Sequence, residues 1–382
     1  MIDLKRANTL MREKKYLEAF EIFSMLKKAY PGFLPYEQGY ELARRLGGVE
    51  CQIPLSANEG MLLEAIHPQS IEMIKAPKKI NVVTPVLNGE RFLSLSLNSV
   101  LSQAGDFFID YFIKDGGSTD MTLQKLLKYS QKIALGVFPI RCLGIRIRAI
   151  SSTDDGMYDA IAYGFSQFNA SSEDKDILTY INADDVFMDG AFSIAAHIFG
   201  ETPAEWLCGQ VHVIDAIGQT IMTPNFPLSY ARADIANGLH DGRSLNFIQQ
   251  EGTFWTLKLY DRVGGVNRKL RLAGDFDLWC RFANYAELLV VDRPLASFRS
   301  HGKQLSKQRD RYYIEVDKII AKARAGQSLE EHNHPEALQF FLKKARKTPA
   351  KAFEQRPGPV CFLNDKGQVR EVAYIKRGWL TW

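Results

Sequence analysis

The chain of 382 residues contains no apolar run near the roughly 20 residues that a membrane-spanning helix needs, which argues against an integral membrane protein. Its first residues, Met1 to Arg6, lack the apolar segment of a signal peptide, so we expect no export. Cysteine is scarce: the five cysteines are scattered and no pair has zinc-ligand or redox spacing. Reduced thiols in the cytoplasm are the expected state.

The charge is unevenly distributed. The whole chain carries +4, while residues 301–382 hold 17 Lys+Arg against 9 Asp+Glu, a net of +8 that leaves −4 for the rest. A basic tail suggests an anionic partner, and with Trp379 and Trp382 we consider peripheral contact with an anionic membrane surface. Ordinary solvated helix faces are the alternative. We expect no nucleic-acid partner.

Residues 1–48 show the helical spacing of apolar positions, with breaks at Lys14-Lys15 and Pro31-Gly32. Part of this segment resembles one tetratricopeptide unit, on the spacing of Ala7, Leu10, Tyr16, Ala19, Phe23, Leu26 and Pro31. A single unit cannot bury its apolar face alone, so we expect it to dock on the chain or on a partner, a second copy included. Residues 49–78 are predicted to be a linker with one short helix over 58–66.

From Lys79 onward, strands and helices alternate, which predicts an α/β domain with a mostly parallel sheet and helices on both faces over 79–302. The first strands are expected over 80–86, 107–113, 145–150 and 177–181. A hairpin is expected around Ala216-Ile217-Gly218, and a helix over 274–285. Residues 303–382 are predicted to be a basic extension with helices over 309–325 and 335–347 and a terminal hairpin-like appendage.

The sequence Asn182-Ala183-Asp184-Asp185 directly follows the buried strand at 177–181. Adjacent carboxylates repel each other and are costly to desolvate, and a cation between them relieves both costs. A divalent-metal site holding a phosphorylated substrate is one hypothesis. A loop in which either aspartate caps the next helix is the other, and this stretch alone does not choose between them.

Polar residues also follow the other strands, at Thr84 to Asn88, Asp115 to Asp120 and Asp154 to Asp159. If the strands are parallel, these segments converge at one edge of the sheet, where open α/β sheets bind ligands. Asp115 can accept hydrogen bonds from a base or a ribose. Plain strand-to-helix turns and helix caps would account for each motif separately.

Five short motifs occur in an order that resembles glycosyltransferase family 2, whose members have the nucleotide-sugar-binding GT-A fold. They are Thr84-Pro85-Val86-Leu87-Asn88 with Ser99 to Gln103, Asp115-Gly116-Gly117-Ser118-Thr119-Asp120, Asp154 to Ala160, Asn182-Ala183-Asp184-Asp185, and Gly274 to Trp279. The resemblance covers roughly residues 79–302. The chain departs from it at Asn182, where members often have Asp, and at Gly274, where many have an acid.

The resemblance implies a role for particular residues. Thr84, Pro85, Asn88, Asp115 and Asp154 would line the donor's nucleoside pocket. Asp184, with Asp185, would hold Mg²⁺ or Mn²⁺ against the diphosphate, and Asn182 would ligate the metal or bond a ribose hydroxyl. Asp275 would be the catalytic base.

Two further segments have less specific roles. Glu251 and Trp255, in Gln249 to Trp255, would lie on the acceptor side, although a strand with core aromatics explains part of this stretch. Arg299 and His301 follow the last predicted strand. Arg299 is a candidate for the diphosphate oxygens, and His301 is a candidate third metal ligand, although a lone histidine is more often not a ligand.

The expected activity is therefore an inverting, metal-dependent transfer of a sugar from a nucleoside-diphosphate donor, a UDP-sugar favoured. The acceptor would be a hydroxyl of a glycan or lipid-linked saccharide, in bacterial surface polysaccharide synthesis at the inner face of the membrane. A non-catalytic nucleotide- or saccharide-binding scaffold is the first alternative. A nucleotidyltransferase is the second, although Asn88-Gly89-Glu90-Arg91 lacks the basic, Gly-rich character that it would need.

Overall fold

The computed structural model describes residues 4–13, 15–29, 61–70, 78–168, 176–224, 228–302, 304, 307–325 and 358–375. The chain divides into two compact units, Met1–Leu55 and Ser56–Trp382. In the first unit, α1 (Leu4–Arg12) packs against α2 (Tyr16–Ala29) around a small core of Ala7, Leu10, Ala19, Phe23 and Leu26. Both helices were predicted. The tetratricopeptide resemblance remains a prediction, because the rest of the segment lies outside the described residues.

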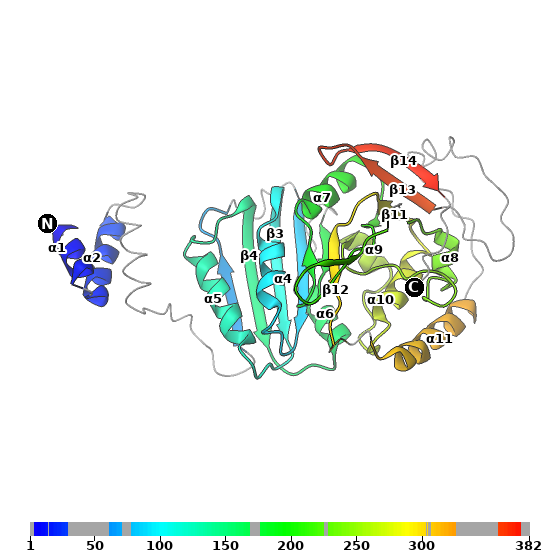
Figure 1. Cartoon of the computed structure of the whole chain (residues 1–382), viewed down its shortest axis with the longest axis horizontal. Helices are drawn as coiled ribbons and strands as arrows, with labels where there is room; N and C mark the ends of the chain where they lie inside the picture. The colour runs from blue at the N-terminus through cyan, green and yellow to red at the C-terminus, as the bar shows by residue number, and fades with distance from the viewer. Residues whose placement is uncertain are drawn as a thin grey trace. The chain divides into compact units, whose positions relative to one another are not determined.

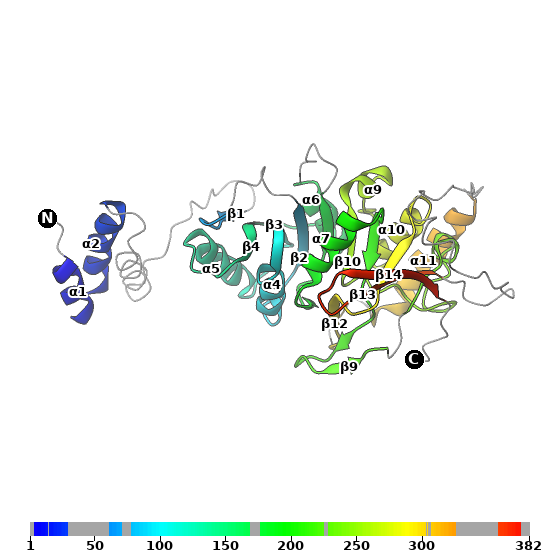
Figure 2. The same cartoon turned by 90° about the horizontal axis from the view of Figure 1, so that it is seen from above.

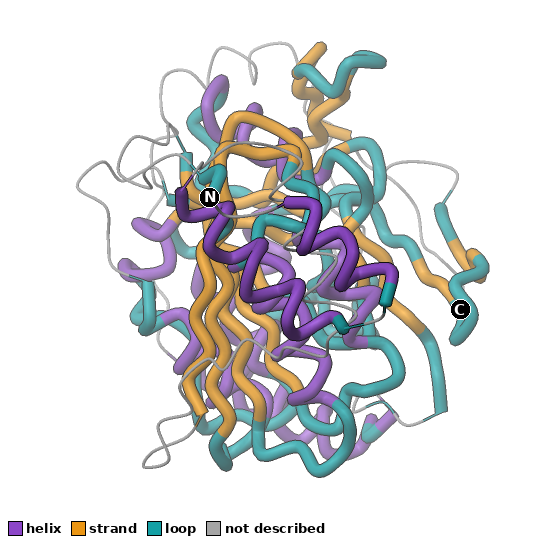
Figure 3. Tube along the Cα trace, turned by 90° about the vertical axis from the view of Figure 1, so that its left-hand side faces the viewer, coloured by secondary structure: helices purple, strands orange, loops and turns teal. Residues whose placement is uncertain are grey.

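The described part of the second unit is built on a ten-stranded mixed sheet of order β1-β4-β3-β2-β5-β10-β7-β11-β13-β14 (Figures 1 and 3). The strands are β1 (Met61–Ile66), β2 (Lys79–Val86), β3 (Ala104–Asp115), β4 (Arg141–Ser151), β5 (Ile177–Tyr180), β7 (Trp206–Cys208), β10 (Thr253–Thr256), β11 (Leu288–Val291), β13 (Gly358–Leu363) and β14 (Val369–Ile375). The central strands β4, β3, β2 and β5 are parallel, with Val86 of β2 opposite Asp115 of β3. Their carboxyl ends therefore share one edge.

Helices cover both faces of this sheet, as predicted for the GT-A fold. One face packs under α4 (Leu93–Leu101), α5 (Thr122–Ala134) and α7 (Ala191–Glu201), and the other under α6 (Met157–Phe165), α8 (Arg232–Ala236), α9 (Leu257–Arg262) and α10 (Gly274–Phe282). Figure 2 shows α4 and α6 on opposite sides. Adjacent residues of β2 alternate accordingly: Val82 joins the first core and Val83 the second.

The short helix predicted over 58–66 is wrong, and so is the assignment of that stretch to a linker. Residues 61–66 form β1, which pairs antiparallel with β4 at the edge of the sheet. Leu63 and Ala65 are buried while Glu64 and Ile66 are exposed, the period of two that a strand with one covered face requires. This alternation is too short to stand out in the sequence.

A second, smaller sheet has the strand order β6-β12-β8-β9, and β6 directly follows β5 in the chain. Its strands are β6 (Val186–Phe187), β8 (Val213–Ile214), β9 (Thr220–Met222) and β12 (Ala296–Arg299). The predicted hairpin is β8–β9, whereas β7 belongs to the main sheet. In the C-terminal extension, α11 (Arg309–Ala325) and the β13–β14 hairpin form as predicted, and β13 pairs with β11. The helix predicted over 335–347 lies outside the described residues. None of the helices in the described ranges combines the length and apolar character needed to span a bilayer.

Candidate active site

Four loops meet at the carboxyl ends of the parallel strands. Gly89, after β2, lies so close to the loop after β5 that a Cβ added there would be 3.4 Å from the Ala183 Cβ. A Cβ added to Gly116, after β3, would be 3.0 Å from Asp154 Oδ2, after β4. A Cβ added to Gly156 would be 2.8 Å from Arg271 Nη1, just before α10. The segments that carry the predicted site residues are therefore neighbours.

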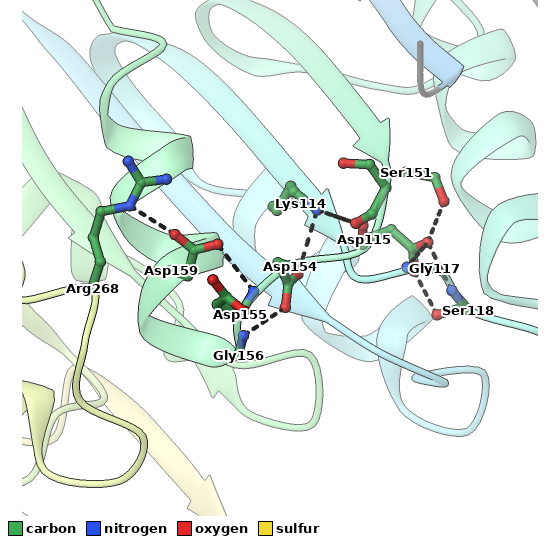
Figure 4. Close-up of polar contacts among 11 residues, drawn as sticks. Lys114, Asp115, Gly117, Ser118, Ser151, Asp154, Asp155, Gly156, Asp159 and Arg268 are labelled. Carbon is green, nitrogen blue, oxygen red and sulfur yellow. Dashed lines mark hydrogen bonds and ion pairs between the residues drawn. The ribbon is translucent and has the colours of Figure 1, made fainter. Parts of the chain in front are cut away.

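Asp115 ends β3 and is fully buried. One carboxylate oxygen, Oδ2, accepts hydrogen bonds from the amides of Gly117 at 3.0 Å and Ser118 at 2.9 Å, and from the Ser151 hydroxyl at 2.6 Å (Figure 4). Its side chain therefore holds the Gly-Gly turn in shape and ties β3 to the end of β4. In a ligand-binding loop such a carboxylate acts by fixing the backbone around it.

Lys114 is the polar residue at this edge that sequence reasoning missed. It is 3% exposed, and its Nζ donates to the Asp115 carbonyl at 2.9 Å and to the Ser152 carbonyl and lies 3.4 Å from Asp154 Oδ2. Asp154 also accepts from the Gly156 amide at 2.9 Å. A lysine inside the apolar run that leads to Asp115 was the available signal, because a buried lysine requires acceptors around it.

The residues predicted from the β2 motif lie at different depths. Thr84 is fully buried, with its Oγ1 2.8 Å from the Tyr111 hydroxyl, and Pro85 is buried in the strand. Asn88 is exposed in a left-handed conformation, φ 52°, and its Oδ1 accepts from the Thr119 amide at 2.9 Å. Of the three, Asn88 has its side chain at the surface of the edge.

Asp184, in the loop after β5, forms a pair with His301, which follows β12 (Ala296–Arg299). Asp184 Oδ2 lies 2.7 Å from His301 Nε2, and the two side chains are 27% and 15% exposed. The guanidinium of Arg299 is buried and donates through Nε to the Asp184 carbonyl at 2.7 Å and through Nη1 to the Asp215 carbonyl at 3.2 Å. Arg299 therefore holds this loop in place. Within the described residues, no group of three His, Cys, Asp or Glu side chains is arranged to hold a metal.

Asp185 turns inward, away from this pair. Its carboxylate accepts from the Arg299 amide at 2.7 Å and from Asn182 Nδ2 at 3.3 Å. The carboxyl of Glu251 is buried as well, and its negative charge acts on Asp185. Burial, followed by the negative charges of Glu251 and Asp184, raises the pKa of Asp185 well above its usual range. Burial likewise raises the pKa of Glu251 to about 7.

Glu251→Gln should stabilise the protein at pH 8 and leave its stability at pH 5 nearly unchanged. A carboxyl whose folded-state pKa rises from 4.5 to about 7 holds its proton more tightly when folded, so its contribution to stability falls as pH rises between those values. Removing the charge should recover about 1–3 kcal/mol at pH 8. Thermal denaturation with a metal chelator measures this. The exposed Glu201→Gln is the control, and an equal gain at pH 5 and pH 8 would contradict the prediction.

Asp275 stands in the first turn of α10. Its Oδ1 accepts from the Tyr158 hydroxyl at 3.0 Å and from the Phe276 amide at 2.8 Å. Burial raises the pKa of Asp275 above its ordinary value, and the hydrogen bonds from the Phe276 amide and Tyr158 offset part of this. Burial also raises the pKa of Tyr158 well above 10, so Tyr158 stays protonated and donates. Asp277 faces elsewhere and pairs with Arg281 at 2.7 Å.

Acidic residues from different segments of this part of the chain affect one another electrostatically. The negative charges of Asp275 and Asp184 both raise the pKa of Glu251, as expected of carboxylates in the same part of the molecule. Trp255 lies elsewhere: it is fully buried in β10, where its ring packs edge-on against Phe165 and Trp279. Its contribution is to the core beneath the site.

A comparison with protein families shows what this part of the chain is similar to. Residues 81–257 match the model of the family described as Glycosyl transferase family 2. Through this stretch the chain is similar to glycosyltransferase family 2. The match includes the segments with Asp115, Asp154, Asp184 and Glu251, whereas Asp275 and His301 lie beyond it. The mixed sheet flanked by helices is consistent with the GT-A fold expected for this family.

Individual relatives are distant. An uncharacterized glycosyltransferase of Rickettsia conorii is 21% identical over 238 residues, which cover 60% of this chain and 35% of that protein. The chain thus spans about a third of the length of this relative. Among solved structures, S. aureus TarS 1–349 in complex with UDP-GlcNAc aligns with a TM-score of 0.49 at 17% identity, over 66% of this chain and 68% of that one. Mannosyltransferase PcManGT from Pyrobaculum calidifontis, in complex with GDP-Man and Mn²⁺, has a TM-score of 0.44 at 13% identity, over 66% and 65%.

The glycine at position 274, a departure from the family 2 pattern, has a steric cause. A Cβ added to Gly274 would lie 2.6 Å from the Tyr158 ring, closer than real Cβ atoms approach. An acidic side chain therefore does not fit beside Tyr158 in this chain. The Tyr158 hydroxyl instead reaches Asp275 over the space that such a side chain would fill.

Proposed function

We propose that the chain is an inverting, metal-dependent glycosyltransferase that uses a nucleoside-diphosphate sugar, a UDP-sugar favoured. The observation that carries the proposal is the 3.0 Å hydrogen bond by which Tyr158 holds the half-buried carboxylate of Asp275. The charge of this carboxylate acts on Glu251, as does that of Asp184. A proton acceptor thus faces the loop on which this family binds its donor phosphates. The match of residues 81–257 to the family model supports the reaction class.

Asp275 is proposed to take the proton from the acceptor hydroxyl as that oxygen attacks the anomeric carbon. A base works best when its pKa lies close to the working pH, and burial moves the pKa of Asp275 in that direction. The Tyr158 hydroxyl, at 3.0 Å, holds the carboxylate so that its other oxygen, Oδ2, is directed to the acceptor. Attack from the side opposite the leaving diphosphate inverts the anomeric centre.

On the donor side, Asn88, Asp115 and Asp154 are proposed to shape the nucleoside pocket, with Lys114 fixing the last two relative to each other. Asp184 and His301 supply a carboxylate oxygen and a ring nitrogen at the partly exposed surface, which fits a divalent cation that completes its shell with diphosphate oxygens and water. Bound there, Mg²⁺ or Mn²⁺ would neutralise charge on the leaving diphosphate. Asp185 fits this role less well, because its carboxylate is buried and accepts hydrogen bonds from the Arg299 amide and from Asn182.

The acceptor is proposed to be a hydroxyl of a glycan or lipid-linked saccharide in bacterial surface polysaccharide synthesis. The basic character of residues 301–382, with a net charge of +8, supports a location at an anionic membrane surface on the cytoplasmic side. Retention of the protein by vesicles with anionic lipid at low salt, and its release at high salt, is the corresponding test.

A thermal-shift panel tests the donor. Nucleoside diphosphates and nucleotide sugars, UDP-GlcNAc and GDP-mannose among them, are added with and without Mn²⁺. Mass action predicts that the true donor raises Tm and does so more with Mn²⁺, and at 100 times its Kd the stabilisation is about 2.7 kcal/mol. Donor binding without transfer or donor hydrolysis would favour a non-catalytic scaffold, and no shift with any nucleotide would contradict the proposal.

A further inference from the structure

The helix α11 lies beyond the residues matched by the family model, yet it packs directly on the helix that carries Asp275. Val316 of α11 is fully buried against Ala273, Phe276 and Cys280 of the α10 segment. Tyr312 and Ile320 of α11 cover the edges of this cluster. Figure 1 shows α11 beside α10. The first helix of the C-terminal extension is thus part of the wall behind Asp275.

Glu315 makes the polar contact between these two helices. Its Oε1 accepts from the Arg271 amide, and its Oε2 accepts from the Leu272 and Ala273 amides, each at 2.9 Å. The N-cap residue of α10 is Ala273, which has no side chain able to accept a hydrogen bond. One carboxylate from another helix therefore satisfies three consecutive N–H groups where α10 begins, and bonds of this kind to a charged acceptor are strong.

We propose that Glu315 is a positioning residue for Asp275, and that α11 is in this way a working part of the active site. The proposal rests on the proposed function, in which Asp275 is the base. Asp275 is two residues from Ala273, so the bonds of Glu315 fix the backbone from which its side chain projects. Tyr158 fixes the carboxylate itself from the other side, at 3.0 Å. The hydrogen bonds of Glu315 to the backbone and that of Tyr158 to the carboxylate together keep Asp275 aligned with an acceptor hydroxyl.

Two of the neighbours of Asp275 affect its proton affinity in opposite directions. The negative charge of Glu315 raises the pKa of Asp275, and the hydrogen bond from Tyr158 lowers it. The other titratable groups that act on Asp275 or are acted on by it are Glu251, Tyr180, Tyr312 and Cys280. All four groups are present in each of the variants described below, so their effects on the pKa of Asp275 cancel when the variants are compared.

The test compares Glu315→Gln, Tyr158→Phe and the control Asp310→Asn, which removes the same charge from an exposed position of α11. Glu315→Gln should lower kcat about tenfold with the donor KM within about twofold, because the loss falls on alignment in the transition state. In the plot of kcat against pH, the acidic limb of Glu315→Gln should move to lower pH, because the negative charge that raises the pKa of Asp275 is gone. The acidic limb of Tyr158→Phe should move to higher pH, because the hydrogen bond that lowers this pKa is lost. Asp310→Asn should match the wild type. Acidic limbs at the wild-type pH in both Glu315→Gln and Tyr158→Phe would overturn the proposal.

Amide hydrogen exchange gives a second readout that does not depend on activity. In Glu315→Gln, exchange at residues 271–273 should be at least about tenfold faster than in the wild type and in Asp310→Asn, because an amide NH₂ cannot replace the second carboxylate oxygen. If the wild type transfers no sugar, the proposed function fails, and only the exchange measurement then tests the role of Glu315. Faster exchange in Glu315→Gln would still show that Glu315 anchors the backbone at the start of α10. Unchanged exchange overturns it.

Discussion

Asp275→Asn should lower the rate of glycosyl transfer by about 10²–10⁴-fold, the contribution of a positioned general base. The substitution keeps the size of the side chain and a carbonyl oxygen that can accept from Tyr158, so the fold and donor binding should persist. The asparagine has no basic oxygen to receive the acceptor's proton. Initial rates with saturating donor and acceptor measure the effect, and the donor thermal shift verifies that binding is retained.

Asp277→Asn is the matched control for this experiment. It lies in the same first turn of α10 but pairs with Arg281 on another side of the helix. Its rate should stay within about threefold of the wild type, because its ion pair with Arg281 makes no contact with Asp275 or Tyr158. Equal losses in the two variants would mean that helix stability, and not proton transfer, accounts for the effect of Asp275.

Asp184→Ala should abolish the additional stabilisation that Mn²⁺ gives to the donor complex and lower the rate of transfer by about 10²-fold or more. The substitution removes the carboxylate oxygen that lies 2.7 Å from His301, and with it the candidate pair for the cation. Thermal shifts with the donor, measured with and without Mn²⁺, give the result directly. Donor binding through the nucleoside pocket should weaken less than the metal-dependent part.

Asp189→Asn provides the comparison, since it changes an exposed carboxylate a few residues further along the same segment. It should retain the full Mn²⁺-dependent shift. A wild-type response to Mn²⁺ in Asp184→Ala would show that the cation, if used, is held elsewhere, and the assignment of the β5 loop would be wrong.

The sequence was sufficient to predict most of the central sheet because its signals are local. The buried run before Asn182 and the alternation of strands with helices predict parallel strands, and parallel strands place Asp115 and the β5 loop at one edge. The boundary at β1 was missed for the opposite reason. Its pairing with β4 involves residues eighty or more positions away, and the only trace of it in the sequence pattern is the apolar character of Leu63 and Ala65.

The side chains that hold the site in shape were harder to predict than those that carry the chemistry. Lys114 left one local signal, but the contact of Glu315 with the Ala273 amide spans 42 residues and leaves none. Arg299 and Trp255 have residue types that suit ligand binding, yet the packing of the sheet buries both. Motif resemblance identifies candidate residues, whereas the direction of each side chain is decided by contacts between distant elements.

A crystal structure of the protein with its nucleotide-sugar donor and Mn²⁺ tests the central claim most directly. We predict one bound donor, with its nucleoside beside Asp115, its diphosphate and the cation at Asp184, and the face of its anomeric carbon opposite the diphosphate turned toward Asp275. A donor or cation bound away from these three aspartates, or a sugar with Asp275 on the leaving-group side, would contradict the account.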